Sequence, residues 1–159
     1  MKKIIFILLF VIISCEDKYS IKIEDKEFIF ELKNTEAANQ IKSKLPFSLK
    51  MKNLNGNEVY YYFDESFKSN DKSVGNINTG DIYLYDSDCL VLFYKSFKTS
   101  YKYTEIGKLV NSDGLENIIG NKDVTVYWCV NDKCSDEVNY YSFVKNNLFL
   151  MVIILLFLL

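Results

Sequence analysis

Alternating and continuous apolar runs between residues 21 and 128 predict a chain built mainly from β-strands. Ile21–Ile23 and Phe28–Leu32 flank the polar triplet Glu24-Asp25-Lys26, a pattern typical of a β-hairpin. Further strands are predicted over Phe47–Met51, Val59–Phe63, Lys108–Val110 and Val124–Trp128. Between the first two of these, Asn55-Gly56 supplies the positive φ of a tight turn.

The stretch from Gly80 to Gly107 is the most informative part of the pattern. Gly80-Asp81 and Asp86-Ser87-Asp88 divide it into two or three strands that are rich in β-branched and aromatic residues. The middle strand is apolar on both faces, and a strand buried on both faces needs a closed or double-layered sheet around it. We therefore predict a mainly β fold in the form of a small closed barrel.

Two helices interrupt the strands. One is predicted over Thr35–Leu45, capped at its first residue or the residue before, and it ends at Pro46. The other is short, over Asp113–Ile119, with a capping box between Asp113 and Glu116. Helices at two points suit a barrel that they plug or cap, and an open sandwich is the alternative.

The N-terminus predicts a secreted protein that carries lipid. Met1-Lys2-Lys3 and the apolar run Ile4–Ile13 form a signal peptide over residues 1–14, too short for a spanning helix of about 20 residues. Ile12-Ile13-Ser14-Cys15 resembles a bacterial lipobox, in which Cys15 is acylated and becomes the new N-terminus. Residues 15–20 would be a tether. We expect a membrane-anchored lipoprotein of the bacterial envelope, on its periplasmic or surface face, with an ordinary secretory signal as the alternative.

The C-terminal part, residues 129–159, differs in composition and is predicted to be an extension of the domain. Its apolar tail, residues 148–159, would span only about 18 Å as a helix, against a hydrocarbon core of roughly 30 Å. Extending that helix upstream would bury Asn146 and Asn147. A marginal membrane anchor, an interfacial segment and a buried terminal strand all remain open for this tail.

The amino-acid composition limits the kinds of fold and functional site that the chain can form. Twelve Tyr, twelve Phe and a single Pro favour a β-rich globule, and roughly 110 residues between the two ends suffice for one domain, residues 21–128. The chain contains no arginine and no histidine, so it lacks a bidentate anion clamp and the usual neutral acid/base. The net charge is −2 without a lysine-rich face, which argues against nucleic acid as a partner. We predict no cofactor and no metal.

The cysteines have separate roles. Cys129 and Cys134 have a spacing that suits a small disulfide loop in an oxidising compartment, with two free thiols as the alternative. A zinc site would need more ligands than this pair provides. Cys89 lies inside the apolar strand, where it is expected to pack as a small hydrophobic residue.

From about Ile21 to Trp128 the chain resembles the small bacterial cyclophilin-like domains, a family of barrel proteins. The matching strings, in the order of the chain, are Leu45-Pro46-Phe47-Ser48-Leu49-Lys50-Met51, Leu54-Asn55-Gly56-Asn57-Glu58, Gly80-Asp81-Ile82, Asp88-Cys89-Leu90-Val91-Leu92-Phe93-Tyr94-Lys95-Ser96-Phe97 and Tyr103-Thr104-Glu105-Ile106-Gly107. The resemblance implies an eight-stranded barrel with two helices, as in cyclophilins proper.

The resemblance does not imply prolyl isomerisation. True cyclophilins rely on an arginine that reaches the proline amide nitrogen, and this chain has none. Lys95, Lys98 or Lys102 would be a poor substitute, because a flexible ammonium lacks the fixed fork of a guanidinium. A weak or unconventional isomerase-like enzyme is therefore an alternative function and not the expected one.

Binding of a small molecule or a peptide is the expected function. Tyr94, Tyr101 and Tyr103 each combine an apolar ring with a hydroxyl, the usual chemistry of a binding groove. Orienting hydrogen bonds are expected from Asp86, Asp88, Ser96, Thr99 and Thr104.

Two other functions compete with binding. Tyrosines at strand spacing also serve as core or wall, and aspartates beside a serine also serve as turn residues, so a purely structural surface lipoprotein is the other alternative. A pocket lined by two or more of these tyrosines favours binding, whereas carboxylates of raised pKa that converge in it favour an enzyme.

Overall fold

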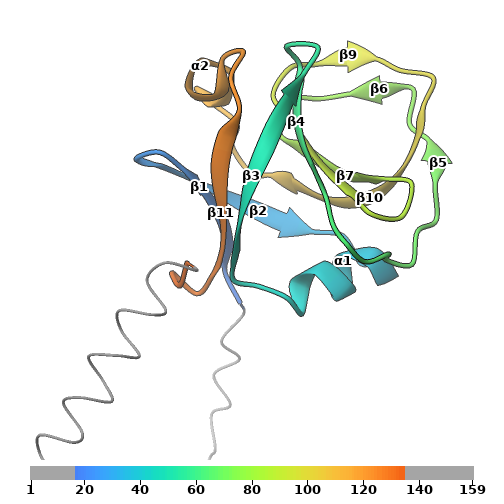
Figure 1. The fold of residues 1–159 in the computed structure, drawn as a ribbon, viewed down its shortest axis with the longest axis horizontal. Helices are drawn as coiled ribbons and strands as arrows, with labels where there is room; N and C mark the ends of the chain where they lie inside the picture. The colour runs from blue at the N-terminus through green and yellow to red at the C-terminus, as the bar shows by residue number, and fades with distance from the viewer. Residues whose placement is uncertain (1–16, 135–159) are drawn as a thin grey trace, which may run out of the picture.

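The computed structural model describes residues 17–134, which form a closed antiparallel barrel of eight strands with two helices (Figure 1). The barrel strands are β1 (Tyr19–Ile23), β2 (Lys26–Leu32), β3 (Phe47–Leu54), β4 (Glu58–Tyr62), β7 (Asp81–Tyr85), β8 (Cys89–Phe93), β10 (Lys102–Leu109) and β11 (Val124–Val130). Their order around the barrel is β2-β1-β11-β3-β4-β8-β7-β10. The predicted hairpin is β1 and β2, and the predicted closed barrel is confirmed.

A short pairing between β2 and β10 closes the barrel. It consists of the partners Gly107 and Leu32, Lys108 and Glu31, and Leu109 and Phe30. On the other side of β10, the register with β7 shifts between Glu105 and Gly107, which marks a β-bulge. Because β2 joins β10, the sheet has no free edge along these strands and the open sandwich is excluded.

β8 is buried along its whole length, as its sequence predicts, and its two faces are covered in different ways. Leu90 and Leu92 point into the barrel and belong to the main core around Trp128. Val91 and Phe93 point outward and belong to a second apolar cluster. Closure of the barrel therefore explains only one of the two buried faces.

The second face is covered by an outer layer that the sequence does not predict. Residues 64–79 contain β5 (Lys72–Ser73) and β6 (Asn76–Ile77). β5 pairs with β10, and β6 pairs with β9 (Phe97–Lys98) to form a ribbon of two strands with two residues each. In Figure 1 this ribbon is seen at the upper right, above β7 and β10 in the view, and β5 at the right edge.

The helices lie at opposite ends of the barrel (Figure 1). α1 (Glu36–Lys42) is capped by Thr35, whose hydroxyl accepts from the Ala38 amide at 3.1 Å and donates to the Glu105 carbonyl at 2.8 Å. The helix buries Ala37, Ala38 and Ile41 in the main core. It ends three residues before the predicted Leu45, because Ser43 already caps its C-terminus.

The prediction for the second helix is wrong at its start. α2 (Leu115–Ile119) begins after Gly114, which adopts a left-handed conformation as N-cap and makes no side-chain capping bond. The Asp113 amide instead donates to Asn111 Oδ1 at 2.7 Å, so the Asp113–Glu116 capping box does not form. Gly120 terminates the helix as its C-cap.

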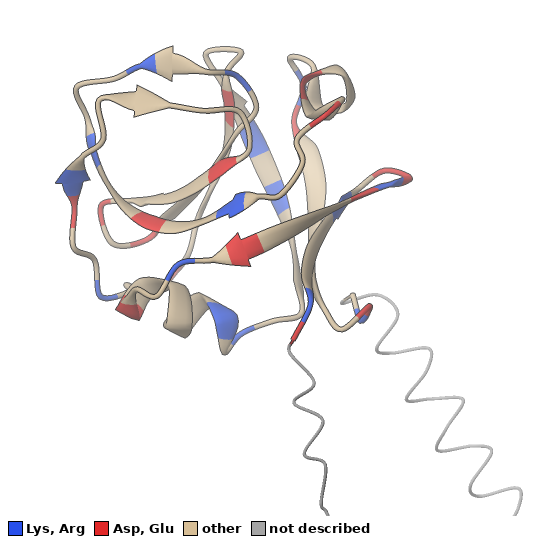
Figure 2. Ribbon diagram, turned by 180° about the vertical axis from the view of Figure 1, so that it is seen from behind, with Lys and Arg blue, Asp and Glu red and all other residues tan. Residues whose placement is uncertain are grey.

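The two ends of the described chain lie side by side. The Lys18 amide donates to Asn131 Oδ1 at 3.0 Å, and the Asn131 amide group donates to Asp17 Oδ1 at 2.9 Å. Figures 1 and 2 both place these ends on the side of the barrel away from β6 and β9. Cys15 and the tail 148–159 lie outside the described residues.

β11 continues past Trp128 to Val130, and Cys129 is buried within it. A disulfide joins Cys129 to Cys134. Along residues 17–134, neither helix is long and apolar enough to cross a bilayer.

Candidate functional site

The outer face of β4, β7, β8 and β10 carries an aromatic cluster. Its buried members are Ile77, Tyr83, Cys89, Val91, Phe93 and Tyr103, and its half-buried members are Tyr60, Val74, Tyr85 and Phe97. Neighbouring rings meet edge to face or tilted, with the Tyr103 centroid 5.7 Å from those of both Phe93 and Tyr85. Such contacts add to the apolar area that the cluster buries and fix the orientation of the rings.

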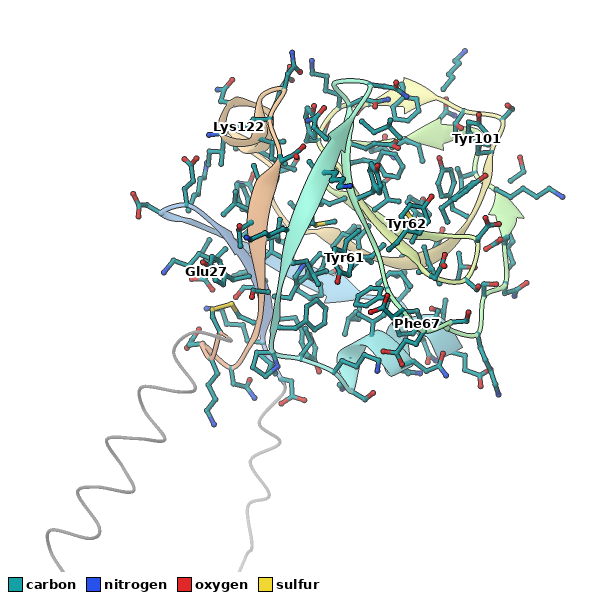
Figure 3. All side chains as sticks on the ribbon, viewed as in Figure 1. Glu27, Tyr61, Tyr62, Phe67, Tyr101 and Lys122 are labelled. Carbon is teal, nitrogen blue, oxygen red and sulfur yellow. A yellow bond between two sulfur atoms is a disulfide. The ribbon has the colours of Figure 1, made fainter. Side chains whose placement is uncertain are left out.

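A pocket of about 300 Å³ opens beside this cluster. We call it the tyrosine pocket, and its lining consists of Leu54, Asn55, Asn57, Glu58, Tyr60, Tyr62, Tyr85, Cys89, Val91, Phe97, Tyr101 and Tyr103. The alternation of β4 produces one wall, because Val59 points into the barrel while Tyr60 and Tyr62 point outward. The rim is exposed and apolar, with Leu54, Tyr62 and Tyr101 exposed by 41%, 54% and 61%. Figure 3 shows Tyr62 and Tyr101 approaching from β4 and from the segment between β9 and β10.

Glu58 is the charged residue of this lining. Burial raises the pKa of its carboxyl group from 4.5 to about 7. Among the described residues Glu58 has no hydrogen-bond or ion-pair partner that would offset this cost. The neighbouring Asn57 also carries a buried side-chain oxygen without a partner. Two acceptor groups at one end of the pocket are therefore left for a ligand to satisfy.

Two other groups in the pocket, the Cys89 thiol and the Tyr103 hydroxyl, stay neutral at physiological pH. Burial raises the pKa of the Cys89 thiol to about 12, and the Tyr62 hydroxyl interacts with that thiol. Burial also raises the pKa of Tyr103 to about 12, with a further contribution from the charge of Glu58. A thiol with such a pKa is a poor nucleophile, so the pocket lacks the activated cysteine of a covalent enzyme.

Two larger hollows are less suited to a ligand. One, of about 710 Å³, lies near the chain ends, and the other, of about 790 Å³, lies between α1 and β5. Several of their charged side chains are already paired, with Lys42 3.8 Å from Asp17 and Lys68 2.6 Å from Glu36. The described residues include no group of three or more acidic or cysteine side chains placed to hold a metal ion.

A family model described as the Cyclophilin-like family matches residues 21–128. The chain belongs to the cyclophilin-like family. The family match ends at Trp128, although the barrel continues as β11 to Val130.

Solved structures also match the chain. The solution structure of a hypothetical protein from Archaeoglobus fulgidus aligns with 72% of this chain and 94% of its own, at 22% identity and a TM-score of 0.49. No curated protein matches the sequence.

The cyclophilin-like barrel brings only some of the predicted binding residues together. Tyr101 and Tyr103 both line the tyrosine pocket. Tyr94 lies outside it, fully buried in the main core, where its hydroxyl accepts a hydrogen bond of 2.7 Å from the Asn53 amide group. Thr104 is buried, lines the hollow between α1 and β5 instead, and donates to Asp71 at 2.6 Å.

The remaining predicted residues shape loops. Ser96 is exposed and accepts from the Thr79 amide at 2.9 Å, which joins the segments before β7 and β9. Asp86 adopts a positive φ of 53° in the turn between β7 and β8. The Asp88 carbonyl accepts from the Phe63 amide at 2.9 Å. These residues hold the frame of the site and do not line it.

Four residues that line the pocket were not among the predicted site residues, namely Glu58, Tyr60, Tyr62 and Tyr85. The string Glu58-Val59-Tyr60-Tyr61-Tyr62 contains the signal, because period-two alternation places its first, third and fifth residues on one face. What the string does not reveal is that an outer layer lies over that face. Without this layer the three residues would form an ordinary exposed strand face.

The buried carboxyl group of Glu58 predicts a pH-dependent stability. The folded state keeps a proton on Glu58 between about pH 4.5 and about 7, where the unfolded state has released it. The free energy of unfolding therefore falls as the pH rises through this window. Because solvent reaches part of the carboxylate, we expect the loss to be on the order of 1–2 kcal/mol.

Glu58→Gln should remove this loss. Denaturant unfolding of the full-length protein, followed by circular dichroism, should give equal stabilities for variant and wild type at pH 4.5 and a more stable variant at pH 8. Glu31→Gln is the matched control, because Glu31 is an exposed carboxylate on β2. A Glu58→Gln protein less stable than the wild type at pH 8 would contradict the assignment of an unpaired carboxylate.

Proposed function

We propose that this cyclophilin-like protein is a lipid-anchored binding module of the bacterial envelope, whose small-molecule or peptide ligand occupies the tyrosine pocket. The observation that carries the proposal is the unpaired carboxylate of Glu58 within an aromatic wall. Pockets that bind small ligands combine apolar and aromatic walls with a few polar groups that orient the ligand. A volume of about 300 Å³ suits a small molecule or a single side chain of a peptide.

The position of the pocket is compatible with anchoring through Cys15. Asp17 and Lys18 bond to the Asn131-Asp132 loop, with Lys18 Nζ 2.8 Å from the Asp132 carboxylate. A tether that starts from this side leaves β6 and β9 on the opposite side of the barrel (Figures 1 and 2), and Phe97 of β9 lines the tyrosine pocket. An anchored barrel would thus keep the pocket open to solvent.

A proton-transfer enzyme is the second candidate, and Glu58 is the observation that favours it. A base with a pKa of about 7 is matched to neutral pH. An enzyme would be favoured by several carboxylates that converge in the pocket, however, and Asp86 and Asp88 do not line it. Nor do Lys95, Lys98 and Lys102, and Lys95 is instead bound to Glu116 at 3.2 Å. Binding therefore accounts for more of the site.

A thermal-shift screen of a ligand library on the full-length protein in a non-ionic detergent tests the binding function. A ligand at 100 times its dissociation constant stabilises the folded state by about 2.7 kcal/mol, which raises the melting temperature measurably. Tyr60→Ala should abolish the shift for true ligands, since it removes part of one wall. Ile29→Ala, which truncates an exposed apolar residue on β2, should retain it. Ligand shifts that survive Tyr60→Ala would place binding elsewhere.

Labelling with radioactive palmitate tests the anchor. We expect wild-type protein in bacterial cells to incorporate the label, and Cys15→Ala to lose it together with the anchor. Globomycin, which blocks lipoprotein signal cleavage, should leave a precursor that is larger by the signal peptide. An unlabelled Cys15 would remove the lipid from the proposal. If Cys15→Ala still sediments with membranes, the apolar tail 148–159 is the segment to delete next.

A further inference from the structure

The charge of the tyrosine pocket has one sign. Its twelve lining residues include one carboxylate, Glu58, and no lysine. The charges of Asp86 and Asp88, outside the lining, act with Glu58 in the same direction, since all three help to raise the pKa of the Cys89 thiol. The floor of the pocket is therefore electronegative, which disfavours an anionic ligand and favours a cation.

Lysines beside the pocket do not neutralise it. Lys52 is the cross-strand partner of Tyr60 on β3, but it is exposed and does not line the pocket. Lys95 is held by Glu116. Within residues 17–134 the Glu58 carboxylate thus has no cation at salt-bridge distance. A half-buried carboxylate in this state is costly, and a bound cation would remove that cost.

The rings supply the second attraction. Tyr60 and Tyr62 meet edge to face at 5.6 Å on one side, and Tyr85 contacts Tyr101 at 5.9 Å on the other. Aromatic faces attract ammonium groups through the ring quadrupole, and several rings around one site suit methylated or primary ammonium groups. The site combines both elements, rings and a carboxylate, in a volume that fits a small cationic group.

We propose that the tyrosine pocket binds an ammonium group, held by the Glu58 carboxylate and surrounded by the rings of Tyr60, Tyr85 and Tyr103. This inference rests on the proposed binding function and names the chemical class of its ligand. The ammonium group belongs either to a free small molecule or to a lysine side chain of a peptide. The Asn57 side-chain oxygen provides a further acceptor for N–H groups on the ligand.

Binding should depend on pH through Glu58. The other titratable side chains of the lining are the thiol of Cys89 on β8 and the hydroxyls of five tyrosines, Tyr60, Tyr62, Tyr85, Tyr101 and Tyr103. Burial raises the pKa of Cys89 and of Tyr103 to about 12. Glu58, whose pKa lies at about 7, is therefore the group that changes charge between pH 5.5 and 8. An ammonium ligand binds the ionised form, so its affinity rises with pH and binding releases a proton below pH 7.

Ligand-observed saturation-transfer NMR on the full-length protein in a non-ionic detergent tests the inference with two matched pairs of probes. Choline is compared with its uncharged isostere 3,3-dimethyl-1-butanol, and Nα-acetyl-lysine methylamide with the norleucine analogue. We expect the charged member of at least one pair to bind about tenfold more tightly than its neutral partner at pH 8, and about tenfold more weakly at pH 5.5 than at pH 8. The pair that shows the preference identifies the source of the ammonium group.

The variants separate this inference from the proposed function. Glu58→Gln should abolish the pH dependence and reduce the preference for charge to the part that the rings supply, and Glu31→Gln should change neither. Equal binding of charged and neutral probes, with no effect of Glu58→Gln, would overturn the ammonium assignment and leave the pocket as a binding site for neutral ligands. Absence of saturation transfer to every cation at pH 8 would overturn it as well. Binding of library ligands that ignores Tyr60→Ala would instead overturn the proposed function.

Discussion

Replacing Gly107 with alanine is expected to open the barrel and to lower the free energy of unfolding by about 3 kcal/mol. Gly107 lies in β10 opposite Leu32 of β2, at the pairing that closes the sheet. A Cβ atom at this position would lie well inside contact distance of the Glu31 carbonyl oxygen, which belongs to the backbone of the neighbouring strand. No side-chain rotation can relieve that overlap, so the two strands must separate.

Gly75→Ala is the control for this prediction. Gly75 has a positive φ of 71° but nothing within 4 Å of an added Cβ. Its substitution should cost about 1 kcal/mol, from backbone strain alone. Denaturant unfolding of both variants measures the difference. A Gly107→Ala protein as stable as Gly75→Ala would show that β2 and β10 can separate slightly without loss, and that barrel closure contributes little.

Truncation of Trp128 is expected to be at least as damaging. Trp128 is fully buried in the main core, with its ring centroid 5.6 Å from that of Phe30 and 5.8 Å from that of Phe47. Trp128→Ala removes these contacts and leaves a cavity between β2, β3 and β11, for a loss of about 3–5 kcal/mol. Because the variant lacks the only tryptophan of the chain, unfolding should be followed by circular dichroism.

Trp128→Phe should cost much less. The indole Nε1 is buried without a hydrogen-bond partner among the described residues, and an unsatisfied donor costs about 1–3 kcal/mol. Phenylalanine keeps an aromatic ring in the core and removes that donor, so the lost volume and the relieved donor partly cancel. Equal losses for Trp128→Phe and Trp128→Ala would mean that the indole nitrogen has a partner after all.

The barrel could be predicted from the sequence because its strands have clear local patterns of apolar and polar residues. β8 is apolar at every position, and the hairpin of β1 and β2 has polar residues at its turn, where Glu24 adopts a positive φ of 52°. The alternation of β4 is equally visible. These patterns reflect burial on one or both faces, and burial in a barrel follows a period of two. Long strands in sequence order therefore carry most of the information about the fold.

The outer layer could not be predicted in the same way. β6 and β9 contain two residues each and lie about twenty positions apart in the chain. Two residues show no periodicity, and their pairing depends on tertiary contacts with the aromatic cluster. Since Phe97 of this layer forms part of the pocket lining, the location of the site could not be predicted either.

Two tyrosines predicted to bind a ligand, Tyr94 and Tyr103, differ in where their side chains lie. Tyr94 has the same parity as Leu90 and Leu92, which places it inside the barrel. Tyr103 has the outward parity of its strand and reaches the pocket. Composition made both look equally suited to a ligand, and only the register of β8 and β10 separates them.

Over residues 17–134 the charged residues do not form one large patch of a single sign, so the electrostatics of the site are set by the residues around it and not by the charge of the whole molecule. Figure 2 shows acidic and basic residues interspersed over the face that it presents. The cyclophilin-like fold itself does not specify a reaction, because one scaffold hosts unrelated functions. In this chain the site residues argue for recognition of a ligand, with Glu58 as its polar centre.

NMR signals of the tyrosine rings test most directly whether the ligand lies in the tyrosine pocket. Full-length protein labelled with ¹³C at the tyrosine rings would be titrated with the strongest ligand from the thermal-shift screen. We expect the signals of Tyr60, Tyr85, Tyr101 and Tyr103 to shift, while those of Tyr19 and Tyr94 stay in place. Shifts confined to Tyr19, or to tyrosines outside the pocket, would contradict binding in this pocket.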